Sequence, residues 1–144
     1  MSGLRRAPNT LAGPLRGIHH VAIIASDYEQ SKRFYVDLLG CTVLAENYRI
    51  ERRSFKLDLA LPDGTQLELF SFPEAPARPS RPEACGLRHL AFHVDSVADW
   101  KAHLERHGVP VEEIRVDEFT GHRFVFFPDP DGLPLELYER SMAV

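Results

Sequence analysis

Two nearly identical phrases, PDGTQLELF from Pro62 and PDGLPLELY from Pro130, constrain the fold of this chain more than any other feature. Residues 61–70 and 129–138 agree at six of ten positions, at an offset of 68 residues. His20 in IHHVAII and His89 in LRHLAFH repeat at almost the same offset, 69 residues. Such a period indicates the duplication of a whole supersecondary unit.

Hydrophobic patterning predicts the same order of elements in both copies, namely strand, helix and three strands. In the first copy the expected strands are 17–26, 41–50, 54–61 and 65–72, and the helix is 28–40 with Asp27 as its cap. In the second copy the expected strands are 86–94, 109–116, 122–127 and 133–140, and the helix is 97–108, capped by Asp95 or Ser96. The fold class is therefore α+β, built from two fused β-α-β-β-β modules.

Segment composition sets the expected boundaries. Residues 1–16 read as a flexible tail and 17–140 as one domain. Within that domain, module one is 17–72, a proline-rich connector is 73–86, and module two is 87–140.

The charge balance excludes several classes of partner. A formal net charge of −4 disfavours binding to nucleic acid or to an anionic membrane surface. The sequence has no apolar run of membrane-spanning length and no apolar secretory signal, which favours a cytoplasmic location. We expect a small-molecule substrate.

Each module carries a histidine in its first strand and a glutamate in its fourth. In module one these are His20 and Glu68, and strand alternation places Leu67 and Leu69 on the core face and Glu68 on the other face. A carboxylate in mid-strand is costly to desolvate unless it is paired or bound to a metal. The alternative to a metal site is that these glutamates lie on a sheet face exposed to water. The repetition of both the histidine and the glutamate in register favours the metal site.

Four ligands follow from the repeat: His20, Glu68, His89 and Glu136. Imidazole and carboxylate together suit one divalent ion, for which Ni, Co and Zn are expected, with Mn and Fe as alternatives. An octahedral ion with four protein ligands keeps two positions for two oxygens of a substrate. This suits proton removal beside a polarised carbonyl, with Glu136 as the favoured base and Glu68 as the second candidate.

Further residues are candidates for substrate binding. His93 follows His89 by four residues on the same strand face. Arg123 is near the start of HRFVFF, where it would bind an anionic group of the substrate. Phe70 and Tyr138 share the faces of the glutamates and would wall an apolar pocket. The alternative for His93 is an exposed histidine without a role, and the alternative for Arg123 is an ordinary surface arginine. For the two aromatic residues the alternative is packing in the core.

These motifs resemble the vicinal oxygen chelate superfamily, which includes glyoxalase I, fosfomycin-resistance thiol transferases, bleomycin-binding proteins and extradiol dioxygenases. The resemblance covers roughly residues 17–140, and DPDGLPLELYE is most similar to short bacterial glyoxalase I-like proteins. It implies a curved sheet around the metal, and a homodimer, since relatives often build the site from modules of two subunits. A metal site within one chain is the alternative.

The ligand positions of glyoxalase I match this sequence one by one. The histidine seven residues before Asp27 is His20 rather than its neighbour His19, which is expected to face away. Glu68, His89 and Glu136 fill the other three positions. Dioxygenases and thiol transferases of the superfamily usually use two His and one Glu, so Glu68 favours the glyoxalase I pattern.

Two glutathione-binding positions of the family are not matched. Ile24 stands where bacterial glyoxalase I has Arg, and Phe72 stands where it has Asn. Apolar side chains do not replace a charge-assisted hydrogen bond. The sequence therefore predicts a glyoxalase I-like lyase or isomerase whose substrate differs from the glutathione adduct that glyoxalase I uses. The alternatives are a thiol transferase of the fosfomycin-resistance type and a non-catalytic drug- or metabolite-binding protein.

Overall fold

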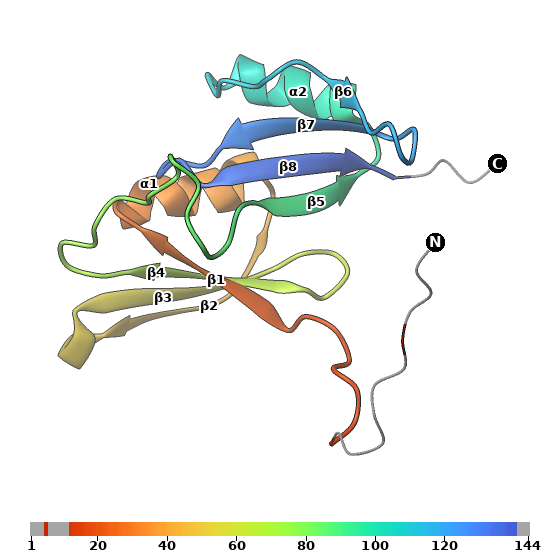
Figure 1. Ribbon diagram of the computed structural model, residues 1–144. Coiled ribbons are helices and arrows are strands. Elements are labelled where there is room, and N and C mark those ends of the chain that lie inside the picture. The colour runs from red at the N-terminus through yellow and green to blue at the C-terminus, as the bar shows by residue number, and fades with distance from the viewer. Residues whose placement is uncertain (1–4, 6–11, 141–144) are drawn as a thin grey trace.

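Two four-stranded mixed sheets of identical topology form the computed structural model, which describes residue 5 and residues 12–140 (Figure 1). The first sheet has the order β1-β4-β3-β2, with β1 (His20–Ala25), β2 (Thr42–Arg49), β3 (Ser54–Ala60) and β4 (Gln66–Ser71). The second has the order β5-β8-β7-β6, with β5 (Leu90–Val94), β6 (Arg115–Val116), β7 (Arg123–Pro128) and β8 (Pro134–Glu139).

The strand directions also agree between the sheets. β1 is parallel to β4, β5 is parallel to β8, and the remaining neighbours are antiparallel. The predicted α+β fold of two β-α-β-β-β modules is confirmed. Most of the predicted tail lies outside the described residues, and residues 12–16 contain no helix or strand. In the described part of the chain, no helix is long and apolar enough to cross a membrane.

The two module helices begin at side-chain caps. α1 (Tyr28–Arg33) starts at Asp27, whose carboxylate accepts from the Gln30 N–H at 3.1 Å, and continues as the π-helical turn η1 (Phe34–Leu38). α2 (Val97–Arg106) starts at Ser96, whose hydroxyl accepts from the Asp99 N–H at 3.1 Å. These contacts confirm Asp27 and select Ser96 over Asp95. A 3-10 turn, η2 (Ile50–Arg52), joins β2 to β3.

The strand predicted at 109–116 is wrong over most of its length, because only Arg115–Val116 pair as β6. Pro110 has no N–H to donate to a ladder. The carbonyls of Val111 and Glu112 instead accept from Lys101 Nζ of α2 at 3.4 and 2.8 Å. The segment therefore packs as a loop against α2.

One continuous apolar core joins the modules. The alternating leucines of β4 and β8 are buried as predicted, namely Leu67, Leu69, Leu135 and Leu137. The opposite face of each sheet, which carries the glutamates, is left uncovered by the helices. The sequence pattern thus decides which face of each sheet is available for chemistry.

The turn before β8 docks onto module one through hydrogen bonds. Tyr35 Oη donates to Asp129 Oδ2 at 2.7 Å, and Asp129 Oδ1 accepts from the N–H groups of Asp131 and Leu133 at 2.9 Å each. Asp131 in turn accepts from the Ser26 N–H at 3.1 Å. Burial, and next the charge of Asp129, raise the pKa of Tyr35, which keeps the phenol protonated as a donor.

Tyr35→Phe is expected to lower the free energy of unfolding by about 1–3 kcal/mol, because the buried Asp129 carboxylate loses its hydroxyl donor. Denaturant titration measures this change. The matched control is Tyr48→Phe on β2, where the side chain is exposed. Equal losses in the two variants would contradict the structural role of the Tyr35 hydroxyl.

Candidate metal centre

The first His–Glu pair lies on the open face of the β1–β4 pair. The parallel register sets Ala22 opposite Glu68 and places His20 two residues earlier on the same face. The Nδ1 atom of His20 lies 3.4 Å from Glu68 Oε2. The Glu68 side chain is only 12% exposed, so its carboxylate is largely withdrawn from water.

The second pair repeats this geometry in module two. Ala91 lies opposite Glu136, and His89 is again two residues earlier. The Nε2 atom of His89 lies 3.1 Å from Glu136 Oε1, and the Glu136 side chain is also 12% exposed. Phe126 meets the His89 ring edge-on, with the ring centroids 5.0 Å apart. Each module therefore presents one imidazole and one shielded carboxylate.

The four predicted ligands come together as two pairs and not as one cluster. Across the described residues, no group of three or more His, Cys, Asp or Glu side chains gathers in a way that would hold a metal ion. A single chain thus supplies two metal-ligating side chains on the open face of each sheet. Both pairs have the nitrogen and oxygen donors that suit borderline divalent ions.

The first pair has polar neighbours that sequence reasoning missed. Asp58 lies opposite Glu68 on β3, and Lys56 Nζ lies 2.7 Å from Asp58 Oδ1 and 3.9 Å from Glu68 Oε1. The alternation of SFKLDLA signals that Lys56 and Asp58 share a face, but only strand pairing shows that this face is that of Glu68. The expectation that His19 faces away is wrong, since its Nδ1 lies 2.9 Å from that of His20.

Three of the predicted substrate-binding residues lie on the open faces. Phe70 follows Glu68 on β4 and stacks with Phe72 at 6.1 Å between centroids. His93 is exposed and lies opposite Tyr138, whose hydroxyl donates to Asp117 Oδ2 at 2.8 Å. The Phe119 N–H, and next the Tyr138 hydroxyl, lower the pKa of Asp117, so this acceptor stays charged.

Arg123 lies on the other face of the second sheet. Its Nε is 3.4 Å from Glu139 Oε1, and Glu139 Oε2 accepts from the Val97 N–H at 3.0 Å. This N–H bond, and to a smaller extent Arg123, lower the pKa of Glu139. Arg123 therefore supports the carboxylate at the start of α2, and its predicted role in substrate binding has no support from this geometry.

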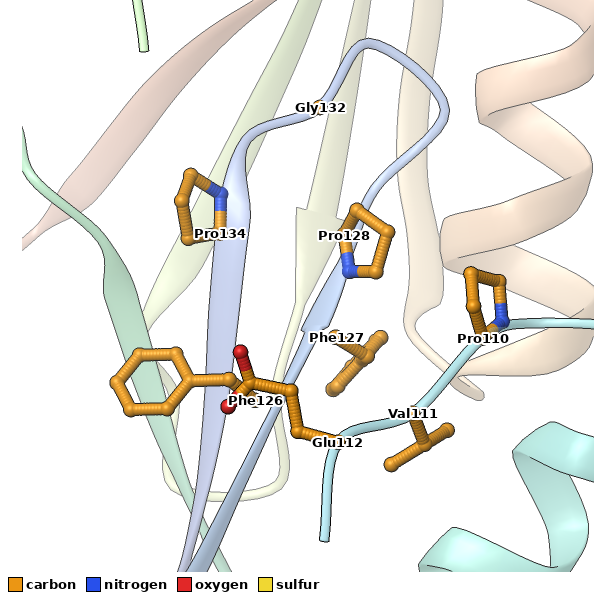
Figure 2. Close-up of a pocket in the computed structure, with 8 residues that line it drawn as sticks. All are labelled: Pro110, Val111, Glu112, Phe126, Phe127, Pro128, Gly132 and Pro134. Atoms are coloured by element: carbon orange, nitrogen blue, oxygen red, sulfur yellow. The ribbon is translucent and has the colours of Figure 1, made fainter. Parts of the chain in front are cut away.

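A shallow pocket of about 390 Å³ adjoins the second pair. Figure 2 shows Phe126 and Pro134 from β7 and β8 with Glu112 from the loop that follows α2. Because Phe126 also contacts His89, the pocket and the His89–Glu136 pair share a wall. Its lining is mainly apolar side chains, which suits the carbon skeleton of a small ligand.

The fold and the repeated pairs define a member of a known superfamily. Residues 17–137 match the family model of the Glyoxalase/Bleomycin resistance protein/Dioxygenase superfamily, and the chain belongs to this superfamily. The resemblance drawn from the ligand motifs is thereby confirmed.

Several relatives match almost the whole domain. The chain is 62% identical over 126 residues to uncharacterized protein YaeR of Escherichia coli (strain K12), covering 88% of this chain and 98% of YaeR. It is 58% identical to uncharacterized protein YwkD of Bacillus subtilis (strain 168), with the same coverage. A solved glyoxalase family protein from Enterococcus faecalis is 54% identical, with a TM-score of 0.80 over 86% of this chain and 98% of that chain.

Proposed function

We propose that two copies of this chain form a divalent metal centre, in which His20 and Glu68 of one copy meet His89 and Glu136 of the other. The repeated His–Glu pairs carry this proposal, because each is half of a four-ligand set on an open sheet face. A closed two-fold dimer would complete two such centres, one for each combination of modules. A homodimer is therefore part of the proposed function.

We propose metal-dependent proton transfer on a substrate with two adjacent oxygens, as in a glyoxalase I-like lyase or isomerase. When bound, the metal supplies Lewis acidity that polarises the substrate carbonyl. Glu136 accepts the proton from the neighbouring carbon and returns it. Lys56 Nζ lies 3.9 Å from Glu68, whereas Glu136 forms an ion pair only with His89 among the described residues. Among the described residues, Glu136 is therefore the carboxylate of the four ligands that has no ammonium group beside it to stabilise its anionic form.

Relatives with named reactions support this chemistry. A 2-epi-5-epi-valiolone epimerase of Actinomyces sp is 30% identical over 83% of this chain and 77% of its own length. A solved lactoylglutathione lyase from Agrobacterium tumefaciens is 25% identical, with a TM-score of 0.66 over 88% of this chain and 96% of that chain. Ile24, on the open face and 54% exposed, leaves the glutathione carboxylate position without a cation, which favours a different substrate.

The test is metal loading combined with hydrogen exchange. Metal-stripped protein is reloaded with nickel, cobalt, zinc or manganese, and bound metal is counted by mass spectrometry. Turnover is followed with the adduct of methylglyoxal and glutathione, and deuterium uptake from D₂O into dihydroxyacetone is followed by NMR. We expect one ion per chain and metal-dependent exchange, even where the glutathione adduct is not consumed.

A matched pair of variants controls for nonspecific metal binding. His20→Ala is expected to lose the bound ion, whereas His107→Ala, at the exposed end of α2, keeps it. Failure to bind stoichiometric metal, or bound metal without exchange or turnover, would overturn the proposed function.

A further inference from the structure

A second feature of the open face in module one is the cation Arg49, which lies over two aromatic rings. Its guanidinium carbon lies 4.9 Å from the ring centre of Phe70 and 5.7 Å from that of Phe72. Its Nη2 donates to Ser54 Oγ at 2.8 Å, and its Nε is shielded from solvent without a hydrogen-bond partner. In the described part of the chain, Arg49 takes part in no ion pair.

A bulge in β2 places Arg49 on this face. Val43 pairs with Leu59 and Ala45 with Asp58, so Leu44 is the extra residue. One extra residue reverses the facing of everything that follows it in the strand. Without the bulge, Arg49 would point with Val43 toward the core side. With it, Arg49 pairs with Ser54 and lies on the face of Lys56 and Glu68.

The charges along this face show where an anion is missing. Lys56 Nζ lies 2.7 Å from Asp58 Oδ1 and 3.9 Å from Glu68 Oε1, so these two carboxylates already have a cation beside them. No carboxylate of the described residues forms an ion pair with Arg49, although the arginine is half-buried beside two aromatic rings. Partial desolvation of a cation without a neighbouring anion costs free energy. An arginine stacked on aromatic rings is well suited to bind a carboxylate or phosphate group.

A second arginine, on the open face of module two, shows the contrast. Arg115 lies over Phe124 and Phe126 of β7 at 5.1 and 5.3 Å, although by strand register its counterpart in module one is Asn47 and not Arg49. Its Nη2, however, lies 3.0 Å from Glu112 Oε2. Each open face thus has an arginine over two aromatic rings, but of these two arginines only Arg115 has a carboxylate partner among the described residues.

We infer that Arg49, over Phe70 and Phe72, binds a carboxylate or phosphate group of the substrate. This inference rests on the proposed function, because it describes the distal end of a substrate whose two oxygens reach the metal beside Glu68. Phe70 follows Glu68 by two residues on β4, a spacing of about 7 Å along a strand. The substrate class is thus a small oxygenated molecule with an anionic group at its far end.

Two matched pairs of probes test this subsite and separate the two anions. Dihydroxyacetone phosphate is compared with dihydroxyacetone, and 2-oxoglutarate with 2-oxopentanoate, so that each pair differs in the distal anion. Calorimetry measures the affinities in metal-loaded and metal-free protein. We expect at least one probe with the distal anion to bind about tenfold or more tightly than the partner that lacks it, and the preference to weaken as salt is raised.

Variants assign the preference to Arg49. Arg49→Gln is expected to remove it and Arg49→Lys to keep part of it, while Arg52→Gln, on the exposed η2 turn, leaves it unchanged. Thermal melts show whether each variant is folded. Equal losses in the Arg49→Gln and Arg52→Gln proteins, or no preference in the wild type, would overturn the inference.

The metal-free arm separates this inference from the proposed function. An anion preference that depends on Arg49 in a protein that binds no stoichiometric metal supports the subsite and refutes the metal centre. Stoichiometric metal without an anion preference supports the metal centre and refutes the subsite.

Discussion

Glu136→Gln is expected to slow metal-dependent proton exchange by about 10²- to 10⁴-fold, the usual contribution of a general base. The amide has the size of the carboxylate but does not accept the proton, and its oxygen still faces His89 across the β5–β8 register. The chain is therefore expected to stay folded and to retain metal. Deuterium uptake and bound metal are measured on the same sample.

The control for this variant is Glu113→Gln, which changes the same functional group at an exposed loop position. Its exchange rate is expected to equal that of the wild type. If Glu136→Gln retains full exchange while Glu68→Gln loses it, the base is reassigned to Glu68. If both retain it, carboxylate catalysis by this site is refuted.

The second large effect is the recovery of activity from two inactive chains. A module-one variant with His20→Ala and Glu68→Gln lacks one pair, and a module-two variant with His89→Ala and Glu136→Gln lacks the other. In a mixed dimer, one centre combines both defects and the other combines two intact pairs. Random re-pairing is thus expected to restore about one quarter of wild-type activity, since half of the dimers are mixed and each has one of two centres intact.

The readout is activity and bound metal after the two variants are unfolded together and refolded. Separately refolded samples that are mixed only afterwards measure exchange between dimers. Recovery after joint refolding establishes a centre shared between chains. No recovery, in a preparation in which mixed dimers are demonstrated by differential tagging, would place each centre within one chain and contradict the two-chain proposal.

The sequence predicts the elements of this protein that depend on local periodicity. The alternation of leucine and glutamate around Glu68 and Glu136 identifies the open face of each sheet, and the repeat predicts that the two faces correspond. It does not predict that the His–Glu pairs lie apart in one chain. That separation depends on how the modules pack, which is decided by contacts such as that of Tyr35 with Asp129.

Two other residues show the limit of strand alternation. Arg49 was missed because the bulge at Leu44 changes its facing, and nothing in the local composition marks a bulge there. For Arg123, its place near the start of HRFVFF predicts a role in binding an anion. Its neighbours Phe124 and Phe126 occupy the open face, so alternation turns Arg123 to the side of α2.

The contact between Tyr35 and Asp129 also bears on how the chain folds. The two residues are 94 positions apart, and each belongs to a different copy of the repeat. In a lone module the Tyr35 hydroxyl or the Asp129 Oδ2 atom would lose this partner, and a single apolar core joins the two halves. The duplicated chain is therefore expected to unfold in one cooperative transition, with no stable state in which a lone module remains native.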